Sequence, residues 1–110
     1  MASGNIDMPI RKTVKIESSD ITNASSGYVI YDRVGNIITM SIAVTKANSS
    51  ALTWNYPDDM IPLRSGMYHR WMADAYNFYM YFYKASRPVV INNNAPAGYE
   101  IVYYFTYLAE

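Results

Sequence analysis

The sequence has no cysteine, a single histidine and no excess of charge of either sign. Without cysteine the chain cannot form disulfides or thiolate zinc sites, and one histidine argues against sites built from several imidazoles. Nine Lys and Arg balance nine Asp and Glu, whereas a protein that binds nucleic acid usually needs a basic excess to neutralise phosphates. No apolar run approaches the roughly 20 residues of a transmembrane helix. We therefore expect no metal, no cofactor, no nucleic-acid partner and no membrane insertion.

Tyrosine is the residue type that stands out. The 110 residues include 12 Tyr, against 3 Phe and 2 Trp. A chain of this length is typical of a single domain. Residues 1–11 carry no apolar periodicity and predict a flexible or partner-docked arm. Residues 12–110 alternate apolar and polar side chains in the manner of half-buried strands, so we expect one β-domain behind the arm.

Residues 27–45 predict a β-hairpin. Its turn is Gly35-Asn36, two residue types that accept the positive φ of a tight two-residue loop. This loop pairs Val34 with Ile37 and so sets the register of the whole hairpin. In that register six apolar side chains share one face, namely Val29, Tyr31, Ile38, Met40, Ile42 and Val44. One apolar face across both strands supports the register.

Further strands are predicted along the rest of the chain. Period-two runs place them at residues 12–17, 51–56, 67–73, 76–84, 89–91 and 99–108, with a helical turn as the alternative at 67–73. Polar or Pro-containing stretches predict loops at residues 18–26, 46–50, 57–66, 85–88 and 92–98. About eight short strands predict an all-β fold, an antiparallel β-sandwich with a jelly-roll-like organisation.

The hairpin resembles a motif of a known family. The run from Tyr31 to Met40, Tyr-Asp-Arg-Val-Gly-Asn-Ile-Ile-Thr-Met, is similar to a strand-turn-strand motif in C-terminal, head-like β-sandwich domains of tailed-phage baseplate and receptor-binding proteins from phages of Gram-positive hosts. The segment from Pro96 to Leu108 resembles the closing strand of these domains, and the resemblance covers residues 27–108. The late Asn-Gly turn common in such domains is absent here.

The resemblance implies a location and a set of partners. It implies a component of the phage virion, at the tail, that is soluble when expressed alone. Such proteins are commonly homotrimers that contact other tail or baseplate proteins. They either bind a saccharide of the host cell wall or build the baseplate itself.

A stripe of tyrosines follows from the alternation of residues 76–84. Phe78, Met80 and Phe82 fall on one side of this strand and are predicted to face the core. Tyr79, Tyr81 and Tyr83 then fall on the other side. Tyrosine offers a rigid apolar ring with a polar tip, which suits an interface with a sister copy. A saccharide ligand and burial within the domain are the alternative interpretations.

The irregular middle of the chain holds the candidates for a saccharide site. Aromatic platforms, acidic acceptors and an arginine donor gather there, at Trp54, Asp58, Asp59, Tyr68, His69, Arg70 and Trp71. Sugars stack their C–H faces on aromatic rings while polar side chains bind their hydroxyls. For Trp54 and Trp71, packing in the core is the alternative. We therefore predict a module that binds host saccharide, or alternatively a purely structural tail or decoration domain with no ligand.

No motif predicts an enzyme. A base at His69 would need a nucleophile and an acid brought to it, and the chain has no nucleophile elbow. The Asp58-Asp59 pair does not match the alternating ligand spacing of a calcium loop. We therefore predict no catalytic residue and no metal ligand.

Overall fold

The computed structural model describes residues 11–64, 66–83 and 87–110. They form an all-β sandwich, as predicted. Eight strands and two short 3₁₀ helices follow one another along the chain: β1 (Arg11–Glu17), η1 (Ser18–Asp20), β2 (Ala24–Val34), β3 (Ile37–Lys46), β4 (Leu52–Asn55), η2 (Asp58–Met60), β5 (Tyr68–Ala73), β6 (Tyr76–Phe82), β7 (Pro88–Asn93) and β8 (Glu100–Leu108). No helix within the described ranges is long and apolar enough to span a membrane.

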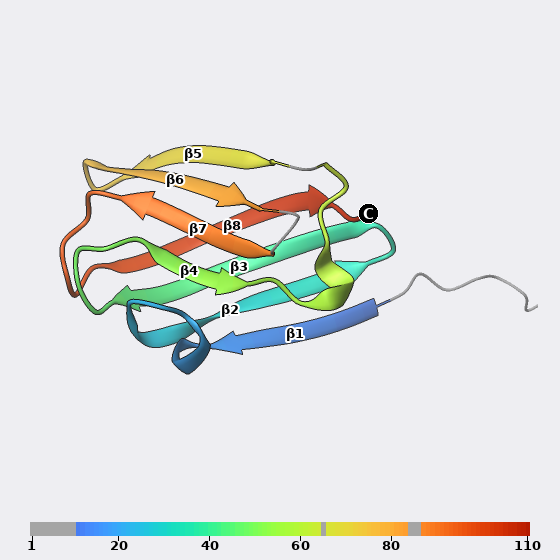
Figure 1. The fold of residues 1–110 in the computed structure, drawn as a ribbon, viewed down its shortest axis with the longest axis horizontal. Coiled ribbons are helices and arrows are strands. Elements are labelled where there is room, and N and C mark those ends of the chain that lie inside the picture. The colour runs from blue at the N-terminus through green and yellow to red at the C-terminus, as the bar shows by residue number, and fades with distance from the viewer. Residues whose placement is uncertain (1–10, 65, 84–86) are drawn as a thin grey trace, which may run out of the picture.

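The strands form two four-stranded sheets. The first sheet has the order β1-β2-β3-β8 and the second has the order β4-β7-β6-β5. Every pairing between named strands is antiparallel. The two sheets lie one behind the other in Figure 1, with their strands running along the long axis of the molecule. In the second sheet the consecutive strands β5, β6 and β7 are neighbours and β4 lies beside β7, which is a Greek-key order.

The predicted hairpin register is confirmed. Val34 pairs with Ile37 across the Gly35-Asn36 turn, and Tyr31 pairs with Met40. All six apolar side chains of the predicted face are buried. The alternation of β6 is confirmed as well, because its Phe and Met side chains are buried while its Tyr side chains are not.

Two predicted loop boundaries are wrong by two residues or more. The segment 18–26 was expected to be a loop, but β2 begins at Ala24 and a register shift between Ala24 and Ser26 lets this polar stretch continue along β3. Gly27 permits that path, because its φ is +98° and a side chain there would collide with the carbonyl oxygen of Ala43. The second boundary is the end of β7, which continues through Asn92 and Asn93 because their backbone pairs with β6. Of the predicted arm at residues 1–11, Arg11 belongs to β1 and residues 1–10 lie outside the described residues. Residue 65 of a predicted loop and residues 84–86 of the predicted strand end and turn also lie outside them.

The core between the sheets is rich in aromatic side chains and contains one lysine. Tyr31, Tyr56 and Phe82 are among its largest fully buried members. Lys46 is also buried, and its ammonium group donates hydrogen bonds to the side chain of Asn93 and to the carbonyl oxygen of Ala95. Burial lowers the pKa of Lys46, because a charged amine loses hydration there.

Candidate functional site

The structure places Trp54 in the core. The side chain lies on β4 and is 3% exposed. Its indole N–H donates a 2.7 Å hydrogen bond to the hydroxyl of Tyr31 on the opposite sheet. A ring enclosed in this way offers no face to a sugar, so core packing is the interpretation that fits Trp54.

His69 and Trp71 point from β5 toward the first sheet. The Trp71 ring stacks on Tyr103 of β8 with centroids 3.9 Å apart and an interplanar angle of 4°. The Trp71 ring also stacks on the ring of Phe78 on β6, with centroids 5.1 Å apart. His69 Nε2 lies 2.5 Å from the hydroxyl of Tyr103 and its ring packs against Phe105. Both side chains are half-buried and join the two sheets. Trp71 also lines a hollow together with Arg70 and Tyr79.

Asp58 and Asp59 lie on η2 and are engaged in ion pairs within the domain. The carboxylate of Asp58 pairs with Arg87, and that of Asp59 pairs with Lys12 on β1. The hydrogen bond from Lys12 lowers the pKa of Asp59, so this carboxylate stays ionised. In Figure 1, η2 lies beyond the end of β4, below β5 and its neighbours. These contacts give both carboxylates a role in holding the η2 connection to its neighbours.

Tyr68 and Arg70 face outward from β5, on the side opposite His69 and Trp71. In the β5–β6 register Tyr68 pairs with Tyr81 and Arg70 pairs with Tyr79. The structure thus divides the seven predicted saccharide residues among the core, the η2 connection and the outer face of the second sheet. It also brings Tyr68 and Arg70 beside the tyrosine stripe, although the sequence predicts them as parts of two separate surfaces.

We call this surface the tyrosine face and define it by the outward side chains of Tyr68, Arg70, Tyr79, Tyr81 and Tyr83. Neighbouring rings contact one another, with centroids 5.6 Å apart for Tyr68 and Tyr79 and 4.5 Å apart for Tyr81 and Tyr83. The guanidinium carbon of Arg70 lies 4.7 Å from the centroid of Tyr79. These rings stand on the outer side of the sandwich, which excludes burial between the sheets for the stripe.

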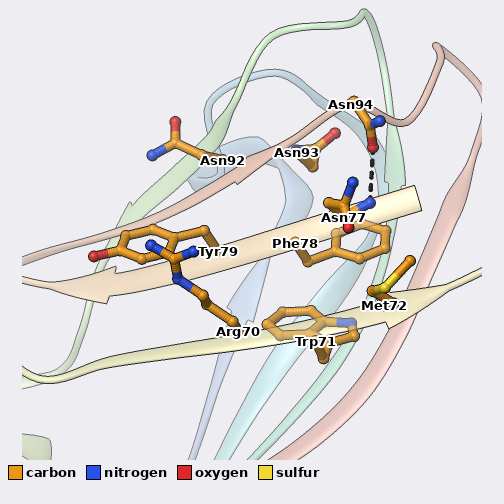
Figure 2. A pocket seen from close by; sticks show the side chains of 9 residues that line it. All are labelled: Arg70, Trp71, Met72, Asn77, Phe78, Tyr79, Asn92, Asn93 and Asn94. Atoms are coloured by element: carbon orange, nitrogen blue, oxygen red, sulfur yellow. Dashed lines mark hydrogen bonds between the residues drawn. The ribbon is translucent and has the colours of Figure 1, made fainter. Parts of the chain in front are cut away.

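A hollow of about 550 Å³ lies beside Tyr79 at the end of the tyrosine face. Figure 2 shows its lining, with Arg70 next to the Tyr79 ring and a row of asparagines along β7. The outward groups are rich in hydrogen-bond donors: a guanidinium, a phenol and the amides of Asn77, Asn92 and Asn94. No carboxylate is among the lining residues, and among the described residues none forms a salt bridge with Arg70.

The asparagines of this hollow are not among the site residues that the sequence predicts. The run Asn92-Asn93-Asn94 predicts a loop, whereas β7 extends through Asn93 and sets Asn92 opposite Tyr79. Asn93 instead turns inward, where its Oδ1 accepts from Lys46. Alternation from Val90 would have placed Asn92 on the outer face, but only the pairing of β7 with β6 brings it beside Tyr79.

A second hollow borders the other end of the tyrosine face. It encloses about 250 Å³ and is lined by Arg64, Gly66, Met67 and Tyr68. The rings of the tyrosine face therefore lie between two hollows, each with an arginine in its lining. This arrangement suits an extended ligand that runs across the rings and places polar groups at both ends.

Comparison with models of protein families, with curated proteins and with solved structures finds no match for this chain.

Proposed function

We propose that this chain is a saccharide-binding module of a phage tail or baseplate, and that its tyrosine face binds a saccharide of the host cell wall. The observation that carries the proposal is the row of outward rings beside a donor-rich hollow. Pyranose rings stack their C–H faces on aromatic side chains, and amides and guanidinium groups bind their hydroxyls. The phage-tail assignment rests on the motif from Tyr31 to Met40 and on the closing strand.

Exposure identifies the rings that a ligand can reach. Tyr68 is 59% exposed and Tyr83 is 48% exposed. Tyr79 and Tyr81 lie half-buried between them, supported by their neighbours and by Arg70. Rings that already contact one another lose little conformational freedom on binding, which lowers the entropic cost of a sugar contact.

A shallow site of this kind is expected to bind weakly, with a Kd near 1 mM, or about −4 kcal/mol. Several linked copies of the site raise the effective affinity by roughly 10²–10⁴ without new contacts. The proposed function therefore requires an oligomeric display of the domain. The trimer implied by the resemblance is one arrangement that provides it.

Binding to purified host cell walls and to a glycan array tests the proposal. Tyr79→Ala and Asn92→Ala are each expected to weaken binding about tenfold, in line with the loss of about 1–2 kcal/mol from one ring or amide contact. Tyr28→Ala is the matched control, because Tyr28 is an exposed tyrosine on β2 of the other sheet. Full binding by folded variants of both site residues contradicts the proposal.

A structural tail or decoration piece without a ligand is the second candidate. It is favoured by an exposed apolar row on the outer face of the first sheet, where Val34 pairs with Ile37 and Ile37 pairs with Leu108. Such a row is typical of a surface that another protein covers. Assembly with tail proteins in the absence of any binding to cell walls or glycans identifies this function.

A further inference from the structure

The four edge strands of the sandwich differ in how they are protected from pairing with another chain. Exposed edges present unpaired backbone groups, and proteins protect them with charges, with short strands or by covering them. β1 carries four charged side chains among its seven residues. β4 is only four residues long, and β5 carries Arg70 in its outer row. Three edges thus have a recognisable protection.

β8 is the exception. It is nine residues long, and its only charged residue is Glu100 at its beginning. Three of its outward side chains are more than half exposed: Val102 (57%), Tyr104 (70%) and Leu108 (55%). Tyr104 is the most exposed of the large hydrophobic side chains in the described part of the chain.

The backbone groups along the open side of β8 can be assigned. The carbonyl oxygen of Leu108 accepts a hydrogen bond from the amide of Leu63, on the side away from β3. The carbonyl oxygen of Tyr99 accepts from Lys46 at the end of β3. Because successive residues of an antiparallel strand point their N–H and C=O groups to opposite sides, the groups of Val102, Tyr104 and Thr106 point away from β3. Among the described residues no strand pairs with this side of β8 between Val102 and Thr106, and only the segment of Pro62 and Leu63 lies beside its end, at Leu108 and Ala109.

We propose that a second copy of this chain pairs with β8 in antiparallel orientation, across a two-fold axis at Tyr104. In this register Tyr104 lies opposite the partner's Tyr104, and Val102 lies opposite the partner's Thr106. None of these residues is charged, and Glu100 lies outside the paired segment from Val102 to Thr106, because Leu63 occupies the position opposite Leu108. No like charges therefore face each other when β8 pairs with the β8 of a second copy. The Lys and Arg side chains of β1 disfavour the equivalent pairing between two β1 strands.

The pairing joins the first sheet of one copy to the first sheet of the other, which gives one continuous sheet of eight strands. A two-fold axis between antiparallel neighbours runs perpendicular to the sheet, so the outer faces of both copies point in the same direction. Both tyrosine faces then lie on one side of the dimer and remain uncovered. The contact stands independently of the proposed function, and it also supplies two co-facing sites. It differs from the trimer that the family resemblance implies.

Sedimentation velocity of the full chain tests the proposal with a register-specific pair of variants. The unaltered chain is expected to sediment as a dimer. In V102K/T106K the lysine at position 102 of each copy lies opposite the lysine at position 106 of its partner. This repulsion between like charges is expected to weaken dimerisation at least tenfold. V102K/T106E sets each introduced lysine opposite an introduced glutamate and is expected to remain a dimer. Both positions are exposed, and far-ultraviolet circular dichroism checks that each variant folds.

Hydrogen exchange at the amide of Tyr104 in the unaltered chain gives a second readout. Exchange is expected to be slow at high protein concentration and faster on dilution, because dilution dissociates the dimer and exposes the edge of β8 to solvent. A monomer, a trimer, a V102K/T106K variant that still dimerises, or a folded V102K/T106E variant that is monomeric overturns the proposal. Exchange at Tyr104 that is fast at every concentration overturns it independently of any variant.

Discussion

The indole N–H of Trp54 donates a hydrogen bond to the hydroxyl of Tyr31 across the two sheets, over 2.7 Å and with both side chains buried. Trp54 lies on β4 of the second sheet and Tyr31 on β2 of the first. The contact fixes how the sheets sit on one another, because a buried indole N–H needs an acceptor at a defined position.

Tyr31→Phe is expected to destabilise the protein by about 1–3 kcal/mol, because it leaves the indole N–H of Trp54 buried without its acceptor. Urea unfolding measures the change. Binding to host cell walls by the folded variant is expected to stay unchanged, since both residues lie away from the tyrosine face. A loss of binding without a loss of stability would show that Trp54 contributes to the saccharide site.

Gly27→Ala is expected to destabilise the protein by about 3 kcal/mol or more, because it introduces a severe backbone collision. A Cβ at Gly27 would lie 2.0 Å from the carbonyl oxygen of Ala43, at a backbone φ of +98°. Gly98→Ala is the matched control. Gly98 has a similar φ of +85° but nothing within 4 Å of the added atom, so only the conformational cost of roughly 1–2 kcal/mol applies. Equal losses of stability for the two variants, measured by urea unfolding, would contradict this account of β2.

Asp58→Asn and Asp59→Asn are expected to leave saccharide binding unchanged. Both carboxylates are exposed and already paired with Arg87 and Lys12, and exposed ion pairs contribute little to stability. Titration with cell-wall fragments checks the first expectation and urea unfolding the second. Loss of binding in either folded variant would show that η2 contributes to the site after all.

Stability is expected to fall as the pH rises above about 10. Burial raises the pKa of Tyr31 and of Tyr107 above the ordinary value of 10.0. The unfolded chain therefore loses these protons first, so stability is full below pH 10 and declines as the pH rises toward the folded-state pKa values. Lys46 acts in the opposite direction, because its pKa is lowered on folding and stability rises with pH as that group deprotonates.

The urea concentration at the midpoint of unfolding, measured between pH 8 and about 11.5, shows how the opposing effects of the two tyrosines and of Lys46 on stability add up. Tyr107→Phe is expected to flatten the decline, at the cost of the hydrogen bond from its hydroxyl to the carbonyl oxygen of Met60. A decline that is equally steep in Tyr107→Phe would mean that other groups dominate the alkaline transition.

The alternation of side chains and the Gly35-Asn36 turn determined the sandwich, the register of the β2–β3 hairpin and the outward direction of the tyrosine stripe. These features depend on neighbours along one strand or across one tight turn, where period and turn geometry leave a single solution.

Only the tertiary structure decided which residues share a surface. Trp54, His69 and Trp71 point inward between the sheets. Asp58 and Asp59 form ion pairs with basic side chains that are distant in the sequence. Asn92 lies beside Tyr79 and Arg70. The tertiary structure also left β8 as the edge without protection. Pairings between strands that are distant in the sequence depend on how whole sheets pack, and no local pattern of residues specifies that packing.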